Sequence, residues 1–385
     1  MQNLNKDVEG LTIYAQLVAH FRESILSGAL PVGSRVPPEL ELARNNRISR
    51  GTVRQAMNIL VNEGLLERTP GRGTYVRQQP QPAQPEPKLP LKWIGLLLSQ
   101  PVFQISIDIL LGVEQIARAR GYELSLTYTE ESQVQQDRDI ERLIDNAVAG
   151  LILLPLSNPI PGEPLKKLVA GKFPLVLVDR YIPELDTDYV VSDNEGGAYR
   201  ATEHLIILGQ RRIGFAYSNA ANFQTTSVRD RWQGYRKALE HYNLAYDESL
   251  LLPDLPLPLS GGPNEYDRVI LRPDRPKAIF AVNDSVALGL LQAAQRNDLK
   301  LPEDLALAGF DDLSFAAYLT PPLTTVAQSR LEIGIRAANL LINRIEGNTG
   351  PYEHVELPTN LLVRASCGVH LHLEQTLPQA IAGAL

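Results

Sequence analysis

The 385-residue sequence has only one cysteine, Cys367. A single cysteine excludes an internal disulfide and any cysteine-cluster metal site, and such scarcity is typical of a cytoplasmic protein. No apolar run approaches the roughly 18 to 20 residues that a membrane helix needs. The first residues, MQNLNK, lack the apolar core of a signal peptide. We therefore expect a soluble, cytoplasmic protein with no membrane partner.

Residues that would carry catalysis are also sparse. The six histidines are scattered, and only His370 and His372 pair, on one face of a possible terminal strand. No Ser/His/Asp arrangement and no glycine-rich phosphate loop is apparent. An enzyme body would need a cofactor lysine or a cluster of histidines and carboxylates. We therefore expect no enzymatic activity, no cofactor and no bound metal.

Positive charge is scarce overall but concentrated in one segment. The chain carries a formal net charge of −7, yet residues 44–77 hold seven arginines against two glutamates, a net charge of +5. The first 77 residues hold ten basic and seven acidic side chains, which leaves the remainder near −10. Phosphate binding needs a focused patch rather than a basic protein, so only this N-terminal segment is expected to contact nucleic acid.

Residues 36–76 have the pattern of a DNA-reading head. A short helical segment at 39–45 is followed by a break and by a second helix that opens at Ser49, a good N-cap residue. One face of the second helix is apolar. Its N-terminal end carries polar side chains that mostly point away from that face: Arg50, Thr52, Arg54 and Gln55. Residues at the N-terminal end of a recognition helix reach base edges in the major groove, so these are candidate DNA contacts.

A hairpin is expected to follow the second helix. Strand-like runs at 65–68 and 74–77 flank the turn TPGRG, and Thr74 directly follows that turn. Gly71 and Gly73 let the backbone approach a phosphate closely, and Arg72 can neutralise the phosphate or enter a minor groove. Arg35, in the loop before the first helix of the motif, could touch phosphate, although a solvated loop arginine is the commoner state. Helix, turn, helix and hairpin together predict a winged helix-turn-helix, mainly α with a β-hairpin wing.

The rest of the chain has the sequence pattern of an α/β protein. Residues 78–90, QQPQPAQPEPKLP, should form a semi-rigid extended linker. From residue 92 short buried runs alternate with amphipathic helices, and the pattern restarts near 196, which indicates parallel sheets covered on both faces. Two successive doubly wound units imply a cleft in which ligands sit at the carboxyl ends of strands.

Polar residues follow several of the predicted strands. They are Gln100 and Phe103 after the first strand, then Asp179–Arg180, Asn283–Asp284 and Asp311–Asp312, and Arg229 at the start of a helix. Carboxylate and guanidinium groups that face each other suit a hydroxyl-rich ligand, because each makes paired hydrogen bonds to neighbouring hydroxyls. We expect Asp284 to cap the next helix, and Arg229 and Asp311 to contact the ligand together.

The head resembles the GntR family of bacterial regulators over roughly residues 13–76. The matching phrases include Gly28–Pro37, SRGTVR at 49–54, GLL at 64–66 and GRGT at 71–74. Many members carry an arginine between the two glutamates of the second helix, where this chain has Leu40, which removes one expected base or phosphate contact. The resemblance implies operator DNA as a partner.

Residues 91–368 resemble the effector domain of the LacI/GalR family, itself similar to periplasmic sugar-binding proteins. The matching phrases include VDR at 178–180, DNEGG at 193–197, RDRWQGY at 229–235, AVND at 281–284, GFDD at 309–312 and PPLTTV at 321–326. By this resemblance Arg229, Asn283 and Asp311 match effector contacts, Phe103 lies in the usual aromatic loop, and Thr225 is a further candidate. Arg180 either binds the effector or braces the hinge. The resemblance also implies a three-segment hinge with crossings near Val191, Gln328 and Val355.

The expected organisation is multidomain. A winged helix-turn-helix at 1–77 and a linker at 78–90 precede a periplasmic-binding-protein-like domain of two doubly wound parallel-sheet subdomains at 91–372, with a tail at 373–385. Subdomain one should hold about 91–191 and 329–348, and subdomain two about 192–327 and 355–370.

A GntR head on a LacI-like body resembles the arabinose-responsive type of regulators. It implies a repressor whose operator affinity is changed by a small sugar bound in the cleft. A homodimer is expected, since two heads on a pseudo-palindrome raise affinity and fix half-site spacing. The alternatives are a regulator that responds to a nucleoside or another small metabolite, because one fold serves several ligands, and an enzyme-fused regulator.

Overall fold

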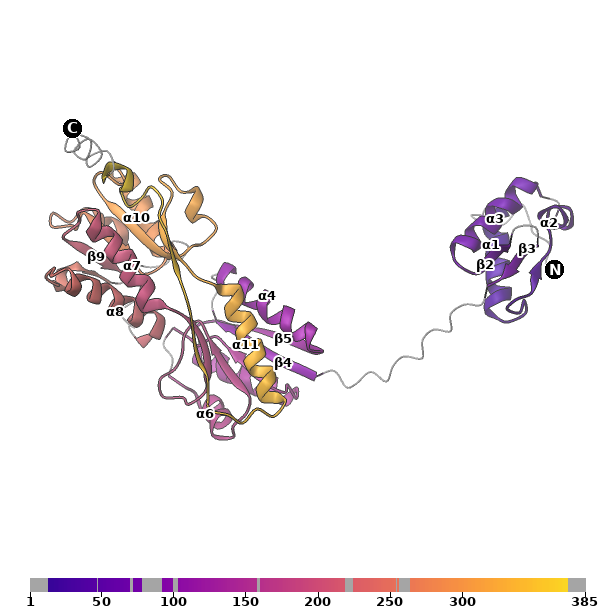
Figure 1. Ribbon diagram of the computed structural model, residues 1–385, viewed down its shortest axis with the longest axis horizontal. Helices are drawn as coiled ribbons and strands as arrows, with labels where there is room; N and C mark the ends of the chain where they lie inside the picture. The colour runs from indigo at the N-terminus through magenta and orange to yellow at the C-terminus, as the bar shows by residue number, and fades with distance from the viewer. Residues whose placement is uncertain are drawn as a thin grey trace, which may run out of the picture. The chain divides into compact units, whose positions relative to one another are not determined.

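The computed structural model describes residues 13–46, 48–69, 72–77, 92–99, 103–157, 160–218, 224–253, 255 and 264–372, without the side chains of 103, 104 and 264. The chain divides into two compact units, residues 1–90 and 91–385 (Figure 1). Each unit is described by itself. The predicted linker and tail, together with Gly71 and Gln100, lie outside the described residues.

The first unit is a winged helix-turn-helix, as the sequence predicted. Its helices are α1 (Ile13–Leu26), α2 (Glu39–Asn45) and α3 (Arg50–Asn62), and its antiparallel strands are β1 (Arg35–Val36), β2 (Leu66–Thr69) and β3 (Gly73–Val76). Helix α3 begins where expected because the Ser49 side chain accepts a hydrogen bond from the backbone N–H of Thr52 at 3.0 Å. Buried Leu17, Val53 and Leu60 hold the unit together. Strand β1, which pairs with β3, falls where the sequence predicted a loop.

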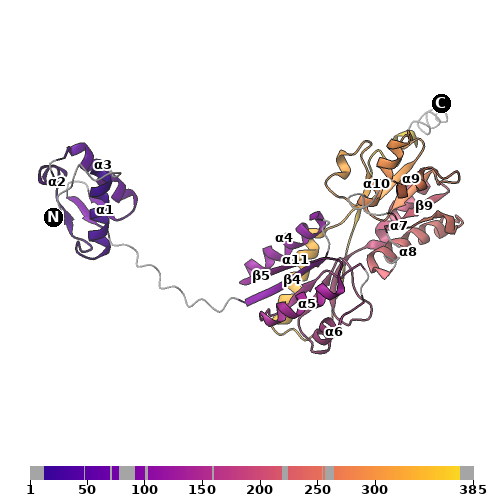
Figure 2. The same cartoon turned by 180° about the vertical axis from the view of Figure 1, so that it is seen from behind.

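Subdomain one of the second unit is built on a six-stranded parallel sheet with the order β14-β8-β7-β6-β4-β5. Its strands are β4 (Lys92–Ser99), β5 (Tyr122–Thr129), β6 (Leu151–Leu153), β7 (Leu175–Val178), β8 (Asp188–Ser192) and β14 (His354–Leu357). Its helices are α4 (Phe103–Ala119), α5 (Gln133–Asp145), α6 (Glu163–Ala170) and α11 (Arg330–Ile345). The central strands are buried, as a sheet with helices on both faces requires (Figure 2).

Subdomain two repeats the design with the strand order β10-β9-β11-β12-β13-β15, in which only β15 is antiparallel. Its strands are β9 (Ile213–Ala216), β10 (Leu251–Leu252), β11 (Ala278–Ala281), β12 (Ala306–Asp311), β13 (Thr324–Ala327) and β15 (Asn360–Leu362). Its α-helices are α7 (Asn194–Ile207), α8 (Thr226–His241), α9 (Asn264–Ile270) and α10 (Asp284–Arg296), and 3-10 turns lie at Glu248–Leu250 and Ala316–Tyr318. Two doubly wound subdomains were predicted and are confirmed.

The chain crosses between the subdomains three times. The crossings lie at Asp193, between β8 and α7, at Gln328–Ser329, between β13 and α11, and at Pro358–Thr359, between β14 and β15. The predicted crossing near Val355 is wrong by a few residues. Strand β14 pairs with β8 as far as Leu357, so residues 354–357 belong to the sheet of subdomain one.

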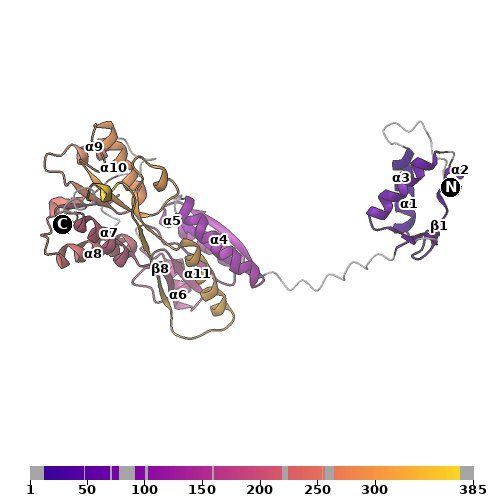
Figure 3. The ribbon, with the colours of Figure 1, turned by 45° about the horizontal axis from the view of Figure 1, so that its top comes forward.

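Helix α11 returns to subdomain one and packs against α4 (Figure 3). The two helices approach closely because glycines face each other. A Cβ built on Gly112 would lie 2.2 Å from the carbonyl oxygen of Leu331, so only glycine fits there. The sequence predicted this return.

The structure corrects one smaller expectation, the pairing of His370 and His372. His370 and His372 lie in a helical turn, at 369–372, and not on a strand, so their side chains do not share a face. Among the described residues, no helix is both long and apolar enough to span a bilayer.

Candidate DNA-reading surface and effector cleft

The predicted reading residues lie on the outer side of α3. The side chains of Arg50 and Arg54 are 62% and 56% exposed, and Gln55 is also exposed. The Ser49 hydroxyl caps the helix and lies 2.8 Å from the Thr52 hydroxyl, so both of these groups are already engaged at the helix start. The two arginines are therefore the long, accessible donors of this surface.

Glu39, at the start of α2, holds three arginines from different elements. Its carboxylate oxygens lie 3.2 Å from Nε of Arg54, 3.7 Å from Nε of Arg50 and 3.4 Å from a terminal nitrogen of Arg68 on β2. Exposed ion pairs add little stability, so their effect here is to orient the arginines. Sequence reasoning missed Glu39 as part of this surface, because its partners lie 11 to 29 positions further along the chain.

The wing brings several other predicted residues together. Its turn is closed by the backbone N–H of Arg72, which donates to the carbonyl of Thr69 at 3.0 Å, and by the Tyr75 hydroxyl, which donates to the carbonyl of Arg72 at 3.0 Å. Gly73 has a φ of +123°, and a Cβ there would meet Nε of Arg35 at 2.9 Å. Arg35 thus lies over the wing turn. Thr74 on β3 lies between its partners Val36 and Arg68.

The second unit places a buried ion pair at the carboxyl end of β12. A terminal nitrogen of Arg231, on α8, lies 3.4 Å from the carboxylate of Asp311, and the two side chains are only 7% and 6% exposed. Arg231 also donates from Nε to the Asn194 side-chain oxygen at 2.9 Å and from a terminal nitrogen to the Val282 carbonyl at 2.8 Å. Its guanidinium carbon lies 3.7 Å from the centre of the Phe310 ring. These contacts fix the guanidinium in one orientation.

Asp311 is also tied to two of the crossings. Its carboxylate accepts a hydrogen bond from Gln328 Nε2 at 2.7 Å, and the Gln328 side-chain oxygen accepts one from the Ser192 hydroxyl at 2.7 Å. Arg330 donates to the Asp311 carbonyl and pairs with Asp108 at 2.9 Å. Burial raises the pKa of Asp311 to about 6; Arg231 opposes that rise and Asp179 adds to it.

The other predicted strand-end residues divide into two groups. Asp179 and Arg180 lie together, with Nε of Arg180 3.2 Å from Asp179 and a terminal nitrogen of Arg180 3.3 Å from the Ser157 hydroxyl. Asn283 caps α10, since its side-chain oxygen accepts from the backbone N–H of Val286 at 2.9 Å.

The predicted capping role of Asp284 is therefore wrong. Asp284 is fully buried, and its carboxylate accepts from the Thr325 hydroxyl at 2.5 Å and from the backbone N–H of Leu313 at 2.8 Å. Burial, reinforced by nearby Asp311, raises its pKa. Asp284 therefore links the segment after β12 to Thr325 on β13, and Asn283, the preceding residue, caps α10.

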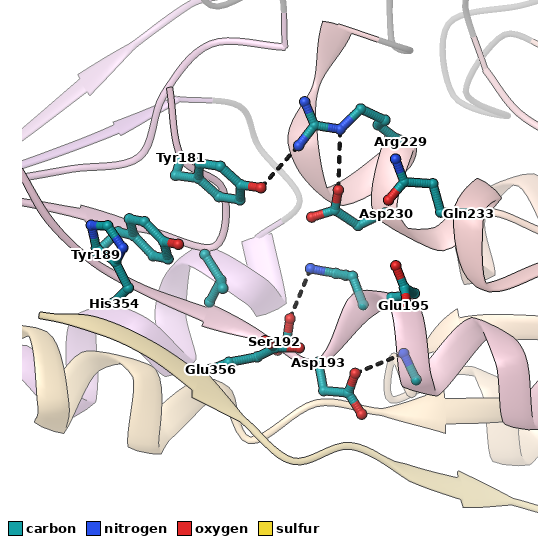
Figure 4. A pocket seen from close by; sticks show the side chains of 13 residues that line it. Tyr181, Tyr189, Ser192, Asp193, Glu195, Arg229, Asp230, Gln233, His354 and Glu356 are labelled. Carbon is teal, nitrogen blue, oxygen red and sulfur yellow. Dashed lines mark hydrogen bonds and ion pairs between the residues drawn. The ribbon is translucent and has the colours of Figure 1, made fainter. Parts of the chain in front are cut away.

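Arg229 does not lie at Asp311, which corrects the predicted pairing. Its terminal nitrogen donates to the Tyr181 hydroxyl at 2.9 Å and its Nε lies 3.2 Å from Asp230 (Figure 4). Arg229, Asp230 and Tyr181 all line a cavity of about 420 Å³ whose walls include neither Arg231 nor Asp311. Residues two apart on a helix point in nearly opposite directions, so Arg229 and Arg231 have different surroundings. The signal for Arg231 was its spacing of four from the apolar Tyr235, which is buried on the same face.

The two remaining predicted effector residues are Thr225 and Phe103. The Thr225 hydroxyl donates to the carbonyl of Ser157. Phe103 is the first residue of α4, and its side chain lies outside the described part of the structure. Among the described residues, no group of three or more histidine, cysteine, aspartate or glutamate side chains is arranged to hold a metal ion.

A winged helix-turn-helix joined to a two-subdomain ligand-binding unit defines a DNA-binding transcription regulator. Family comparison agrees for both units. Residues 13–76 match the model for bacterial regulatory proteins of the gntR family, and residues 202–367 match the model for periplasmic binding protein-like domains.

The chain belongs to the family of arabinose metabolism transcriptional repressors. It is 32% identical to such a repressor from Geobacillus stearothermophilus over 86% of this chain and 91% of that protein. It is 29% identical to the one from Halalkalibacterium halodurans over 87% of this chain and 90% of that protein. These relatives are transcriptional repressors and not enzymes.

Solved structures agree with this placement. A LacI family regulator from Enterococcus faecium with bound ribose is 26% identical over 71% of this chain and 98% of that chain, with a TM-score of 0.63. A CelR–cellobiose complex is 26% identical over 86% of this chain and 100% of that chain, with a TM-score of 0.64. The chain is thus a DNA-binding transcriptional repressor with an effector-type second unit.

Proposed function

We propose that a pentose sugar, with L-arabinose the first candidate, binds at Arg231 and Asp311 and changes the affinity of this repressor for its operator. The buried Arg231–Asp311 pair carries this proposal. A fixed guanidinium beside a carboxylate offers adjacent donors and acceptors, which match neighbouring sugar hydroxyls. Both subdomains supply polar groups to the proposed site. Subdomain one contributes Asp179 and Arg180, and subdomain two contributes Asn283 and Asp311.

Comparison supports the sugar class. Two relatives are named for arabinose metabolism, ribose operon repressors of Haemophilus influenzae and Escherichia coli are 29% and 30% identical, and one solved relative holds ribose. Gln328 and Asp311 connect the site to the crossings, so a ligand that alters their hydrogen bonds can favour one subdomain arrangement over another.

The operator contacts follow from the exposed arginines of the head. Arg50 and Arg54, with Gln55, are proposed to read base edges, because they project from the first turns of α3. Arg35, Arg72 and the backbone of the wing are proposed to hold phosphates, and Gly71, Gly73 and Thr74 complete that set. Ser49 and Thr52 shape the start of the reading helix.

We further infer that the repressor is a homodimer joined through subdomain one. Helices α4 and α11 expose a group of apolar side chains: Ile107 at 47%, Leu111 at 53% and Leu331 at 46%. Helices α4 and α11 meet beside these residues, because a Cβ built on Gly112 would lie 2.2 Å from the carbonyl oxygen of Leu331. We call these three residues the apolar face. A second copy of this chain would cover it and bring two heads to a two-fold operator.

The test is thermal melting of the full chain against L-arabinose, D-ribose, D-xylose, glucose, cellobiose, sugar phosphates and nucleosides. A sugar at 100 times its Kd adds about 2.7 kcal/mol of stability. A rise in Tm with a pentose, together with a change in operator affinity in the same sugar, supports the proposal. A rise only with a nucleoside or a sugar phosphate would replace the proposed effector class. No rise with any of these ligands, at millimolar concentration, contradicts the pentose.

A further inference from the structure

The first turn of α8 contacts subdomain one at a place separate from Arg231 and Asp311. Helix α8 packs against α7 and belongs to subdomain two. Tyr181 follows β7 and packs against the core of subdomain one. Contacts between these segments therefore join the two subdomains.

Thr226 makes the central contact. Its hydroxyl oxygen accepts a hydrogen bond from the backbone N–H of Tyr181 at 3.0 Å and donates one to the backbone carbonyl of the same residue at 3.1 Å. Thr226 is fully buried. One hydroxyl thus satisfies both backbone groups of a residue in the opposite subdomain, which an apolar side chain of the same shape cannot do.

Two neighbours on the same turn strengthen the contact. The Thr225 hydroxyl donates to the carbonyl of Ser157, which follows β6 in subdomain one, and Arg229 donates to the Tyr181 hydroxyl at 2.9 Å (Figure 4). Tyr181 is itself held in place. Its ring stacks on Tyr189 with centroids 4.6 Å apart, and Tyr189 stacks on His354 at 4.1 Å.

These bonds can form only while the two subdomains are together. A hinge motion about the three crossings would separate α8 from the Tyr181 loop and leave the Thr226 hydroxyl and both Tyr181 backbone groups to be rehydrated. We propose that Thr225 at the N-cap of α8, and Thr226 and Arg229 on that helix, form a latch with Ser157 and Tyr181 that sets the fraction of closed cleft before sugar binds. This inference rests on the proposed function in one respect, namely that the sugar binds the closed cleft.

A latch of this kind tunes the affinity without touching the ligand. When only the closed form binds the sugar, the apparent Kd rises as the closed fraction falls. Loss of the paired hydrogen bonds at Thr226 should lower the ratio of closed to open cleft about tenfold, the effect of one to two net hydrogen bonds. The strength of the latch would thus set the sugar concentration at which the repressor responds.

The first experiment compares Thr226→Val with two matched variants in the full chain. Thr226→Ser keeps the hydroxyl. Thr202→Val removes an equally buried hydroxyl that donates to the carbonyl of Ala198, within its own helix, at 2.8 Å. We expect Thr226→Val to raise the Kd for L-arabinose several-fold, up to about tenfold, and both matched variants to stay within about twofold of the parent. Each variant should still bind the operator without sugar, which shows that it is folded.

Tyr181→Phe supplies a second, milder change. It removes only the hydrogen bond with Arg229 and leaves the two backbone bonds to Thr226, so the Kd should rise by no more than about threefold. A Thr226→Val protein that folds and binds L-arabinose as the parent does would overturn the latch. So would an equal loss in Thr202→Val.

A second measurement separates failure of the latch from failure of the sugar assignment. Fluorescent labels at Glu141→Cys on α5 and Glu240→Cys on α8, both exposed positions, report the distance between the subdomains by energy transfer, while buried Cys367 stays unlabelled. If the parent binds no pentose, the proposed function fails, yet the latch still predicts a different mean transfer efficiency in Thr226→Val than in Thr202→Val. The same efficiency in both variants without sugar would then overturn the latch.

Discussion

Arg231 holds its guanidinium 3.4 Å from the carboxylate of Asp311 while it donates to Asn194 and lies over the ring of Phe310. The pair is formed within subdomain two, where β12 ends and α8 passes. Its energetic value lies in orientation more than in stability, since a buried ion pair gains little over apolar packing but loses much when one partner is removed. Two oppositely charged groups in one fixed geometry are what a polyhydroxylated ligand can recognise.

Removal of Arg231 should abolish the response to sugar. We expect Arg231→Ala to weaken L-arabinose binding more than 100-fold, or about 3 kcal/mol, because it leaves Asp311 buried and unpaired. Arg231→Lys should keep the charge but lose the fork geometry, with an intermediate loss. Titration calorimetry measures both, and operator binding without sugar checks folding. Arg229→Ala should lose less than about tenfold. An equal loss in Arg229→Ala and Arg231→Ala would show that the two arginines had been assigned wrongly.

Sugar binding should weaken in mild acid. Burial raises the pKa of Asp311 to about 6, against an ordinary value of 3.8. At pH 5 only about one-tenth of the carboxylate is ionised, so affinity for L-arabinose should fall about tenfold between pH 7.5 and 5. Calorimetry at both values measures this fall, and Asp311→Asn should bind weakly with no such dependence. A parent protein with constant affinity across this range would contradict the role of the ionised carboxylate.

The raised pKa of Asp311 also predicts how the free energy of unfolding changes with pH. The folded state holds the proton of Asp311 more tightly than the unfolded state, so this group contributes stability below about pH 4 that is lost as the pH rises through 6. In unfolding experiments, Asp311→Asn should therefore flatten the pH dependence of the unfolding free energy between pH 4 and 6. An unchanged slope would show that Asp311 titrates normally.

The sequence predicted what depends on local patterns and missed what depends on distant partners. Ser49 as a cap and the Gly-Arg-Gly turn are signals within a few residues, so the winged helix-turn-helix was predictable almost in full. The strong apolar runs of β4, β6 and β7 likewise predicted a parallel sheet. Short strands such as β1 and β15 exist only because partners far along the chain pair with them, and no local pattern marks them.

Among the candidate site residues, too, local signals were predictable and distant partners were not. Asp311 was predictable because it ends a strand, and strand ends meet at the cleft. Glu39 and the hydrogen bond between Gln328 and Asp311 were not, since each depends on a partner 11 or more positions away in the sequence. Arg231 could have been found from the helical period, because it shares a face with buried Tyr235, whereas Arg229 was predicted from its place at the start of the helix and from the family resemblance.

Substitution of Arg54 and of Arg72 in the head should affect DNA binding in different ways. Arg54→Ala removes a proposed base contact and should cost about 1 to 3 kcal/mol on the cognate operator, with a smaller effect on unrelated DNA. Arg72→Ala removes a proposed phosphate contact and should weaken binding to all sequences alike, with a salt slope lower by about one. Fluorescence anisotropy over a series of salt concentrations distinguishes them. Arg22→Ala, which loses an exposed pair with Glu63, is the matched control and should change neither quantity.

Equal loss of specificity from Arg54→Ala and Arg72→Ala would remove the distinction between reading helix and wing. Retained specificity in Arg54→Ala would move base reading to Arg50 or Gln55, the other exposed residues of the first turns of α3.

The apolar face of α4 and α11 should control oligomeric state. Leu111→Asp places a charge at its centre and should shift the protein from dimer to monomer in sedimentation velocity, because a carboxylate buried without a partner opposes association. Operator affinity should fall at the same time, since a monomer presents one head to a two-fold site. Ile207→Asp is the matched control: this residue is 57% exposed on α7 of subdomain two, against 53% for Leu111, and its replacement should leave the dimer intact. A Leu111→Asp protein that remains dimeric would place the interface elsewhere, and dissociation of the Ile207→Asp protein would place it on subdomain two.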